Sequence, residues 1–218
     1  MNNKIDKLIK QFAKLPRVGA RAAQRIVLSL LQDKTGRAAA LSVALSDAAE
    51  NIKPCPVCGC LTDAGGVSHT PQCEFCRDGG RANGQICIVR DLGDVWTIEK
   101  SGCFRGRYHI IGGLISGANG TTPDDLNIAT LAPRIKNESI TEIIFALPNT
   151  IEGKTTEHYI MGIVGANENS PGNATDSRAN FHSPLQFTEL ASGVPLGGDL
   201  DYIDDGTLSI AFGGRKQI

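Results

Sequence analysis

Four cysteines have the residue type and the spacing to bind a metal ion. They form two Cys-x-x-Cys pairs, Cys55 with Cys58 and Cys73 with Cys76, with fourteen residues between the pairs. Thiolates in this arrangement are typical ligands of tetrahedral zinc. Because protein sulfur fills all four positions, no position remains for a reactive water. The pattern therefore predicts one structural Zn²⁺ per chain and no catalytic metal.

Two disulfides in a secreted module would be another use of four cysteines. Residues 1–10 have the pattern of an amphipathic helix, not of a secretion signal. Cys60, Cys87 and Cys103 would also stay unpaired, which an oxidising compartment tolerates poorly. The longest apolar runs are too short to span a bilayer. We therefore expect a cytoplasmic protein with no membrane segment.

The charges are distributed unevenly along the chain, although the net charge is only −1. Residues 1–37 contain two acids and these nine basic residues: Lys4, Lys7, Lys10, Lys14, Arg17, Arg21, Arg25, Lys34 and Arg37. Such a basic segment indicates an arm that meets phosphates or an acidic surface. Acids gather near the C-terminus at Asp199, Asp201, Asp204 and Asp205. We expect these four to bind a basic partner or a neighbouring subunit, with a solvated turn as the alternative.

The apolar periodicity predicts helices first and then alternating strands and helices. Helices are expected at residues 4–14, 22–30 and 37–52. From residue 85 onward, strands are expected at 86–89, 108–111, 142–147 and 185–190, and helices at 93–101, 123–136 and 153–164. This alternation predicts a mostly parallel sheet covered by helices. Trp96 is expected in the core, His109 in a structural role, and residues 165–183 in an exposed loop.

The first two predicted helices are joined by Leu15-Pro16-Arg17-Val18-Gly19, which resembles the turn of a helix–hairpin–helix. In that motif, backbone N–H groups of the turn and of the second helix bind a DNA phosphate. Arg21 and Arg25 lie one helical turn apart, so with Lys14 and Arg17 they could contact one stretch of backbone without reading sequence. Arg17 stands where the motif usually has glycine. A plain hairpin with a solvated basic face is therefore the alternative.

The order of these parts resembles the RecR family of bacterial recombination mediators over nearly the whole chain. The matching segments are residues 15–25, the cysteine quartet, Gly106-Arg107-Tyr108-His109, Pro123-Asp124-Asp125, Thr150-Ile151-Glu152-Gly153 and residues 193–208. The resemblance implies a non-enzymatic DNA-binding protein that helps load recombinase onto gapped DNA with RecO and RecF. It also implies homo-oligomers, either dimers or tetrameric rings, and a sheet of the Toprim class.

Several positions depart from the acids of that class. Arg90 stands where the Toprim pattern places a glutamate, and Leu147-Pro148-Asn149 replaces an Asp-x-Asp pair. Asn119 and Lys154 stand where the family usually has acids. A hard cation needs several anionic oxygen ligands, so no Mg²⁺ site is expected. A Toprim-type metal-dependent enzyme and a protein-only adaptor that no longer binds DNA remain as alternatives.

The expected architecture is therefore an α/β chain of four parts. These are a helix–hairpin–helix DNA-binding arm (residues 1–53), a four-cysteine zinc module (54–78), a Toprim-like domain (79–184), and a C-terminal strand and assembly segment (185–218).

Overall fold

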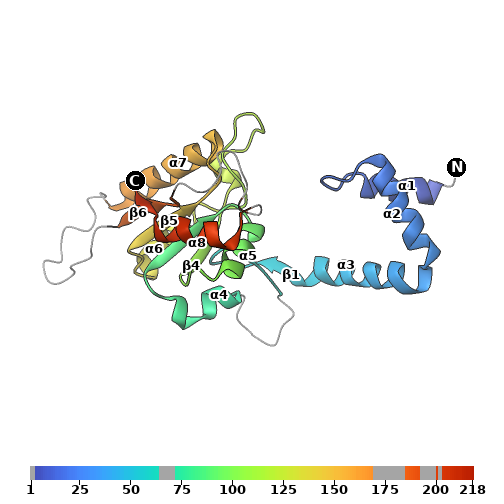
Figure 1. The fold of residues 1–218 in the computed structure, drawn as a ribbon, viewed down its shortest axis with the longest axis horizontal. Helices are drawn as coiled ribbons and strands as arrows, with labels where there is room; N and C mark the ends of the chain where they lie inside the picture. The colour runs from blue at the N-terminus through green and yellow to red at the C-terminus, as the bar shows by residue number, and fades with distance from the viewer. Residues whose placement is uncertain (1–2, 64–71, 169–184, 192–199, 201–202) are drawn as a thin grey trace, which may run out of the picture. The chain divides into compact units, whose positions relative to one another are not determined.

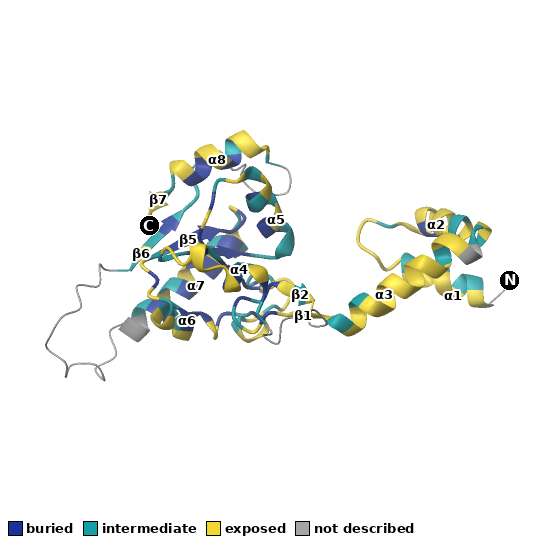
Figure 2. Ribbon diagram, turned by 90° about the horizontal axis from the view of Figure 1, so that it is seen from below, coloured by how far each residue is buried: buried dark blue, intermediate teal, exposed yellow. Residues whose placement is uncertain are grey.

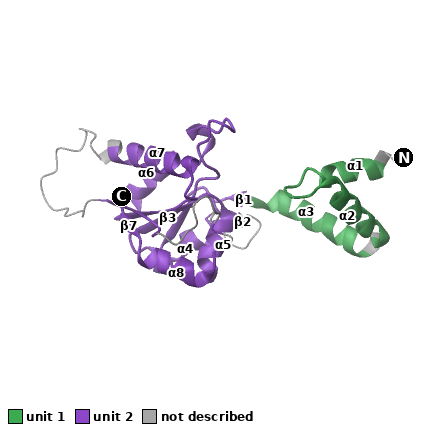
Figure 3. Ribbon diagram, turned by 45° about the horizontal axis from the view of Figure 1, so that its top comes forward, with its two compact units in different colours: residues 1–52 green, residues 53–218 purple. Residues whose placement is uncertain are grey.

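The computed structural model describes residues 3–63, 72–168, 185–191, 200 and 203–218. The chain divides into two compact units, residues 1–52 and 53–218 (Figure 3). Most of the predicted loop at 165–183 falls outside the described residues, as do Asp199 and Asp201. None of the helices within the described ranges is both long and apolar enough to cross a membrane.

The first unit consists of three α-helices and one short π-helical turn. The elements are α1 (Asn3–Phe12), α2 (Ala20–Gln32), η1 (Lys34–Ala38) and α3 (Ala39–Asn51). Asp33 is the N-cap residue of η1, because its carboxylate accepts hydrogen bonds from the backbone N–H groups of Gly36 and Arg37. The helices expected in this region are present, and α1 packs against α2.

The second unit contains a five-stranded sheet with the order β4-β3-β5-β6-β7. Strands β3 (Gln85–Val89), β4 (Arg107–Ile110), β5 (Glu142–Ala146) and β6 (Gln186–Glu189) are parallel, and β7 (Lys216–Gln217) is antiparallel to β6. The predicted mostly parallel sheet is therefore confirmed. The short last strand was not predicted, because two polar residues carry no strand signal.

Helices cover both faces of this sheet (Figure 1). Successive strand residues point to opposite faces, and the two core clusters follow this alternation. Cys87 and Val89 pack with α5 (Leu92–Ser101) and α8 (Asp205–Gly213). Ile86 and Ile88 pack with α6 (Leu131–Asn137) and α7 (Ile151–Glu168). Both clusters are buried, which gives a three-layer α/β/α unit (Figure 2).

A small cysteine-containing module joins the face that carries α5 and α8. It comprises β1 (Ile52–Pro54), β2 (Leu61–Asp63), α4 (Glu74–Arg77) and the 3₁₀ turn η2 (Gly79–Arg81). β1 pairs with β2 in a separate two-stranded sheet. Its cysteines belong to the same buried cluster as Val95 of α5 and Phe212 of α8.

Two local predictions were wrong. Residues 123–136 do not form one helix, since a 3₁₀ turn η3 (Pro123–Asp125) is followed by α6. Asp125 accepts hydrogen bonds from the N–H and hydroxyl of Thr122, and the N–H of Asn127 donates to the carbonyl of Ile111, which holds the chain against the sheet. Trp96 is 64% exposed. The buried face of α5 is formed by Asp94, Val95 and Ile98, and Trp96 lies outside it.

Candidate functional site

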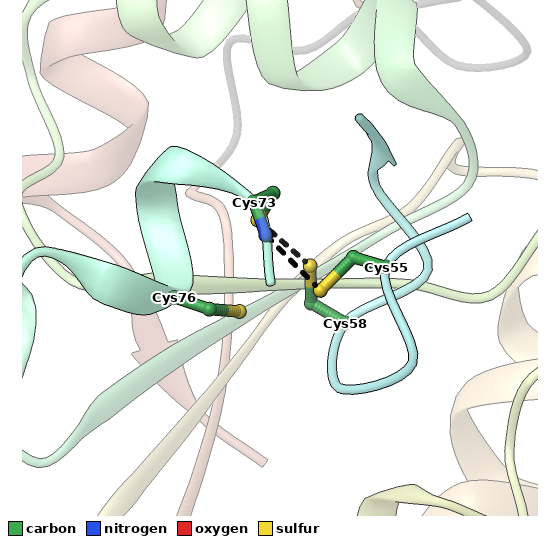
Figure 4. A group of neighbouring side chains, drawn as sticks. All are labelled: Cys55, Cys58, Cys73 and Cys76. Atoms are coloured by element: carbon green, nitrogen blue, oxygen red, sulfur yellow. Dashed lines mark hydrogen bonds between the residues drawn. The ribbon is translucent and has the colours of Figure 1, made fainter. Parts of the chain in front are cut away.

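The four cysteines of the two pairs lie together in one buried cluster (Figure 4). Their Sγ atoms all lie within 4.8 Å of one another, and those of Cys58 and Cys73 are 3.4 Å apart. A tetrahedral ion with metal–sulfur bonds of about 2.3 Å would place its ligand sulfurs about 3.8 Å apart. The residues that the sequence predicted as ligands are thus brought together with the spacing of a metal site.

A tight turn carries the first cysteine pair between β1 and β2. The N–H of Cys55 donates to the carbonyl of Cys60 at 2.7 Å, and the N–H of Gly59 donates to that of Cys55 at 2.9 Å. Gly59 has a φ of +78°, and a Cβ at this position would lie 2.7 Å from the carbonyl oxygen of Ile110. Only glycine combines this backbone conformation with so close an approach to β4.

Backbone N–H groups point at the cysteine sulfurs. Cys60 donates to the Sγ of Cys58 at 3.4 Å, and Cys73 donates to the Sγ of Cys55 at 3.5 Å. Crowding separates the pKa values of the thiols. The nearby thiol of Cys58 lowers the pKa of Cys55, and the nearby thiol of Cys55 raises the pKa of Cys58. Four thiolates in such a small buried volume require a cation to balance their charge.

The cysteine module is fixed to β4, which is an edge strand of the five-stranded sheet. The N–H of Ile110 donates to the carbonyl of Cys58 at 2.7 Å. Arg81 donates to both carboxylate oxygens of Glu99, at 2.9 and 2.6 Å, and the hydroxyl of Tyr108 donates to Glu99 at 2.6 Å. The Arg81 guanidinium also lies over the ring of Phe75. Helix α5, β4 and the module are therefore tied together by one polar network.

His109 is a structural residue, as expected. Burial lowers its pKa to about 4, so the ring is neutral near pH 7. Its Nε2 lies 2.7 Å from the carbonyl oxygen of Asn127, and its Nδ1 lies 3.3 Å from Nη1 of Arg134. Because a carbonyl can only accept, Nε2 carries the proton and Nδ1 accepts from the arginine.

The predicted DNA-binding residues Lys14, Arg17, Arg21 and Arg25 are all exposed on the first unit. The N–H of Val18 donates to the carbonyl of Leu15 at 3.1 Å and closes the turn between α1 and α2. Arg17 has a φ of +64°, the conformation for which the motif normally uses glycine. Gly19 is the N-cap residue of α2, and it provides no side-chain hydrogen bond to the first turn of the helix.

The carboxyl ends of the sheet strands carry ion pairs. Nε of Arg90 lies 2.9 Å from a carboxylate oxygen of Asp91, and Nη2 of Arg90 lies 3.6 Å from Asp94. A cleft of about 340 Å³ contains Arg90, Asn119 and Glu152, and Glu152 is the one acid among the described residues that line it. Lys154 on α7 pairs with Glu157 and with Glu189 of β6. At this edge of the sheet Asp91, Asp94, Glu157 and Glu189 are thus paired with a cation, either Arg90 or Lys154.

Two of the four predicted C-terminal acids can be placed. Asp204 is the N-cap residue of α8. Its carboxylate accepts hydrogen bonds from the backbone N–H of Thr207 at 3.0 Å and from the Thr207 hydroxyl at 2.6 Å. Asp205 lies 3.9 Å from the Nζ of Lys100. Sequence reasoning missed Arg81, Glu99 and Arg134. Tyr108 and His109 within the quoted Gly-Arg-Tyr-His segment were the available signal for these partners.

Comparisons with known proteins agree with this architecture. Family models match for the RecR helix-hairpin-helix at residues 5–49, the Toprim domain at 84–172 and the RecR C-terminal segment at 193–216. The chain is 39% identical over 213 residues to recombination protein RecR of Cereibacter sphaeroides, which covers 98% of this chain and 96% of that protein. It is 40% identical over 216 residues to RecR of Paracoccus denitrificans, covering 99% and 98% of the two chains. With its helical arm, buried cysteine cluster and Toprim sheet, the chain belongs to the RecR family of recombination proteins.

Proposed function

We propose that the protein is a DNA-binding recombination mediator of the bacterial cytoplasm. In this role it is a scaffold that helps load recombinase onto gapped DNA together with RecO- and RecF-type partners. The proposal that the chain binds DNA rests on the properties of the first turn of α2. This turn lacks a side-chain cap, contains no acid, and is flanked by the exposed Arg17, Arg21 and Arg25.

The start of α2 has the properties of a phosphate site. The first N–H groups of a helix have no partner within the helix, and the helix dipole adds partial positive charge there. The side chains of Arg21 and Arg25 lie on one helical face and can reach neighbouring phosphates. The glycine-like conformation of Arg17 supports the hairpin interpretation over a plain amphipathic pair of helices.

A scaffold without catalysis is favoured over a Toprim enzyme. Magnesium-dependent chemistry on phosphodiesters needs several carboxylates around the ions. Arg90 is paired with Asp91 and Asp94, and Lys154 occupies the space between Glu157 and Glu189. These carboxylates are therefore already paired with protein cations, which disfavours their use as ligands of a divalent ion.

The first unit supports self-association. Among its described side chains only Ala23 and Val27 are buried, and helix α3 has no buried residue. Large apolar side chains of the three helices and of the turn between α1 and α2 are exposed, namely Leu8, Leu15, Ile26, Leu28, Leu41, Val43 and Leu45. Apolar surface of this extent is characteristic of an interaction face. We propose that another copy of the chain covers it in a homo-oligomer.

The buried quartet supports a structural Zn²⁺. Cys55, Cys58, Cys73 and Cys76 would supply all four ligands, and the ion would hold the turn of the first pair against α4. Zinc bound in this way contributes directly to the folding free energy of its module.

DNA binding is tested by fluorescence anisotropy of labelled single-stranded and duplex DNA across a salt series with Mg²⁺. The native chain is compared with Arg21→Ala/Arg25→Ala and with Arg77→Ala/Arg105→Ala. The second variant removes two exposed arginines of the other unit, so it controls for net charge. We expect the arm variant to bind more weakly and its log–log salt slope to fall by about 2, since each lost phosphate contact removes about 1.

The same samples are run on a denaturing gel. Intact DNA with a reduced slope for the arm variant alone supports the proposal. Equal effects of both variants would assign binding to net charge and not to the arm. No binding by the native chain at low salt would leave a protein-only adaptor, and Mg²⁺-dependent cleavage would establish a Toprim enzyme.

A further inference from the structure

Arg134 of α6 is a buried arginine beside the cysteine cluster. Its side chain is 3% exposed. Nη2 donates to the Sγ of Cys76 at 3.9 Å, Nη1 donates to the carbonyl oxygen of Tyr108, and Nε donates to Glu138 at 2.8 Å. One edge of the guanidinium thus contacts a member of the quartet, and the rest contacts β4 and the end of α6.

The orientation of this guanidinium is fixed by its neighbours. His109 donates from Nε2 to the carbonyl of Asn127, so its Nδ1 presents a lone pair to Nη1 of Arg134. The carboxylate of Glu138 accepts a hydrogen bond from Nε. With these contacts made, Nη2 is directed towards Cys76 and cannot turn away without breaking them.

Charged side chains near the cysteine cluster balance part of the negative charge that the cluster would carry with a bound metal. A divalent ion with four thiolates carries two net negative charges, which are costly to bury without compensation. Glu138 pairs with both Arg134 and Arg107, and the Arg107 pair is 2.7 Å long. Two cations and one carboxylate leave one positive charge at this place, and Arg134 is the member of the group that touches a ligand sulfur.

We propose that Arg134 is a positioning residue of the metal centre. Its Nη2 donates to the metal-bound thiolate of Cys76, offsets part of the charge of the cluster, and slows metal loss. The inference rests on the metal site of the proposed function. Sequence spacing alone cannot reveal it, because Arg134 lies 58 residues from Cys76.

The test uses the full chain loaded with Co²⁺, whose sulfur-to-metal charge-transfer band reports on the thiolates. Arg134→Met is expected to release metal to a chelator about 10- to 100-fold faster, because losing a hydrogen-bond partner of a metal ligand usually lowers metal affinity by that factor. The band should also move to lower energy, because sulfur electrons are less stabilised without the nearby cation. Arg134→Lys keeps the charge and should restore most of both properties.

Arg81 provides a matched control. It is also buried, donates to the carbonyl of Gly106 just before β4, and packs on Phe75 of the module. Within the described part of the chain, its hydrogen bonds and ion pairs involve Asp78, Glu99 and Gly106 and no cysteine sulfur. Arg81→Met should destabilise the module without moving the band. Glu138→Gln retains Arg134 and removes a negative charge, so it should move the band to higher energy. If Arg134→Met does not fold, the Glu138→Gln variant still tests the proposal.

Each outcome decides the proposal. Faster release and a lower-energy band in Arg134→Met, or a higher-energy band in Glu138→Gln, support it. Equal acceleration in Arg134→Met and Arg81→Met without a band shift would show that Arg134 acts only through packing, and would overturn it. An unchanged band in both Arg134→Met and Glu138→Gln would do the same. A native chain that takes up no Co²⁺ would overturn the metal site itself, and this inference with it.

Discussion

The guanidinium of Arg215 makes two hydrogen bonds to the carboxylate of Glu142. Nε lies 2.6 Å from Oε1 and Nη2 lies 3.1 Å from Oε2, although the two residues are 73 positions apart. Gln85 and Thr188 also donate to this carboxylate, so β3, β5, β6 and the C-terminal residues meet at one anion.

Arg215→Met should lower the free energy of unfolding by about 2 kcal/mol, the usual size for a hydrogen bond to a charged group. The Arg215 hydrogen bond holds the pKa of Glu142 below its ordinary value. This stabilisation is therefore complete above the unfolded pKa of a glutamate and is lost as pH falls through the lower folded pKa. Urea unfolding across pH should show the two proteins converging in acid. Lys216→Met, an exposed neighbour, is the control, and a gap that widens in acid would contradict the prediction.

Cys58→Ser should abolish stoichiometric zinc, because it removes one of the four ligands. Cys60→Ser should retain it, since Cys60 is buried beside the quartet but is not one of its members. Zinc content by mass spectrometry checks both. Hydrogen exchange at Ile110 should accelerate in Cys58→Ser alone, because the carbonyl of Cys58 holds that amide. An equal zinc content in the two variants would show that the four cysteines of the quartet are not the zinc ligands.

Arg17→Gly should be more stable than Arg17→Ala. Both variants lose the charge, but only glycine adopts the positive φ of this turn without strain. A left-handed conformation costs a non-glycine residue about 1–2 kcal/mol. Glycine loses more conformational entropy on folding, and this offsets about 0.5–1 kcal/mol of its advantage. Thermal unfolding of the two variants measures the difference. Both should lower the DNA salt slope by about 1. A more stable alanine variant would mean that the turn is misassigned.

Lys154→Met should destabilise the chain by about 2 kcal/mol, because it leaves the buried carboxylate of Glu157 without its partner. Burial already raises the pKa of Glu157. Removing the lysine raises this pKa further, so the destabilisation should grow as pH rises above the ordinary range of a glutamate. Lys154→Met/Glu157→Gln should recover most of the loss in urea unfolding. Failure of this rescue at neutral pH would show that Lys154 contributes only through packing.

Local spacing allowed the sequence to predict much of the fold. The Cys-x-x-Cys pairs require no knowledge of tertiary structure, because each pair is held by one turn. The strands at 86–89 and 142–147 are short apolar runs buried on both faces, which is the strongest signal a parallel sheet produces. The position of Arg17 was recognised as one where the motif usually has glycine, but its positive φ became known only from the structure.

The remaining features depend on contacts between distant residues. Trp96 was placed in the core from its chemistry, but α5 can bury only the face that carries Val95 and Ile98. The helix expected at 123–136 is interrupted because Asn127 bonds to the end of β4, a contact that local periodicity does not encode. Arg134 and Glu99 were not singled out from the sequence, since their partners come from other elements.

The bond between Ile110 and Cys58 places the cysteine turn along β4, at an edge of the sheet. An uncovered edge strand offers its backbone to a strand of another molecule and so promotes aggregation. If the proposed metal holds the cysteine turn in place, a chain that lacks this metal would present the edge during folding. Metal supply would then limit how much protein remains in solution, before any question of DNA affinity arises.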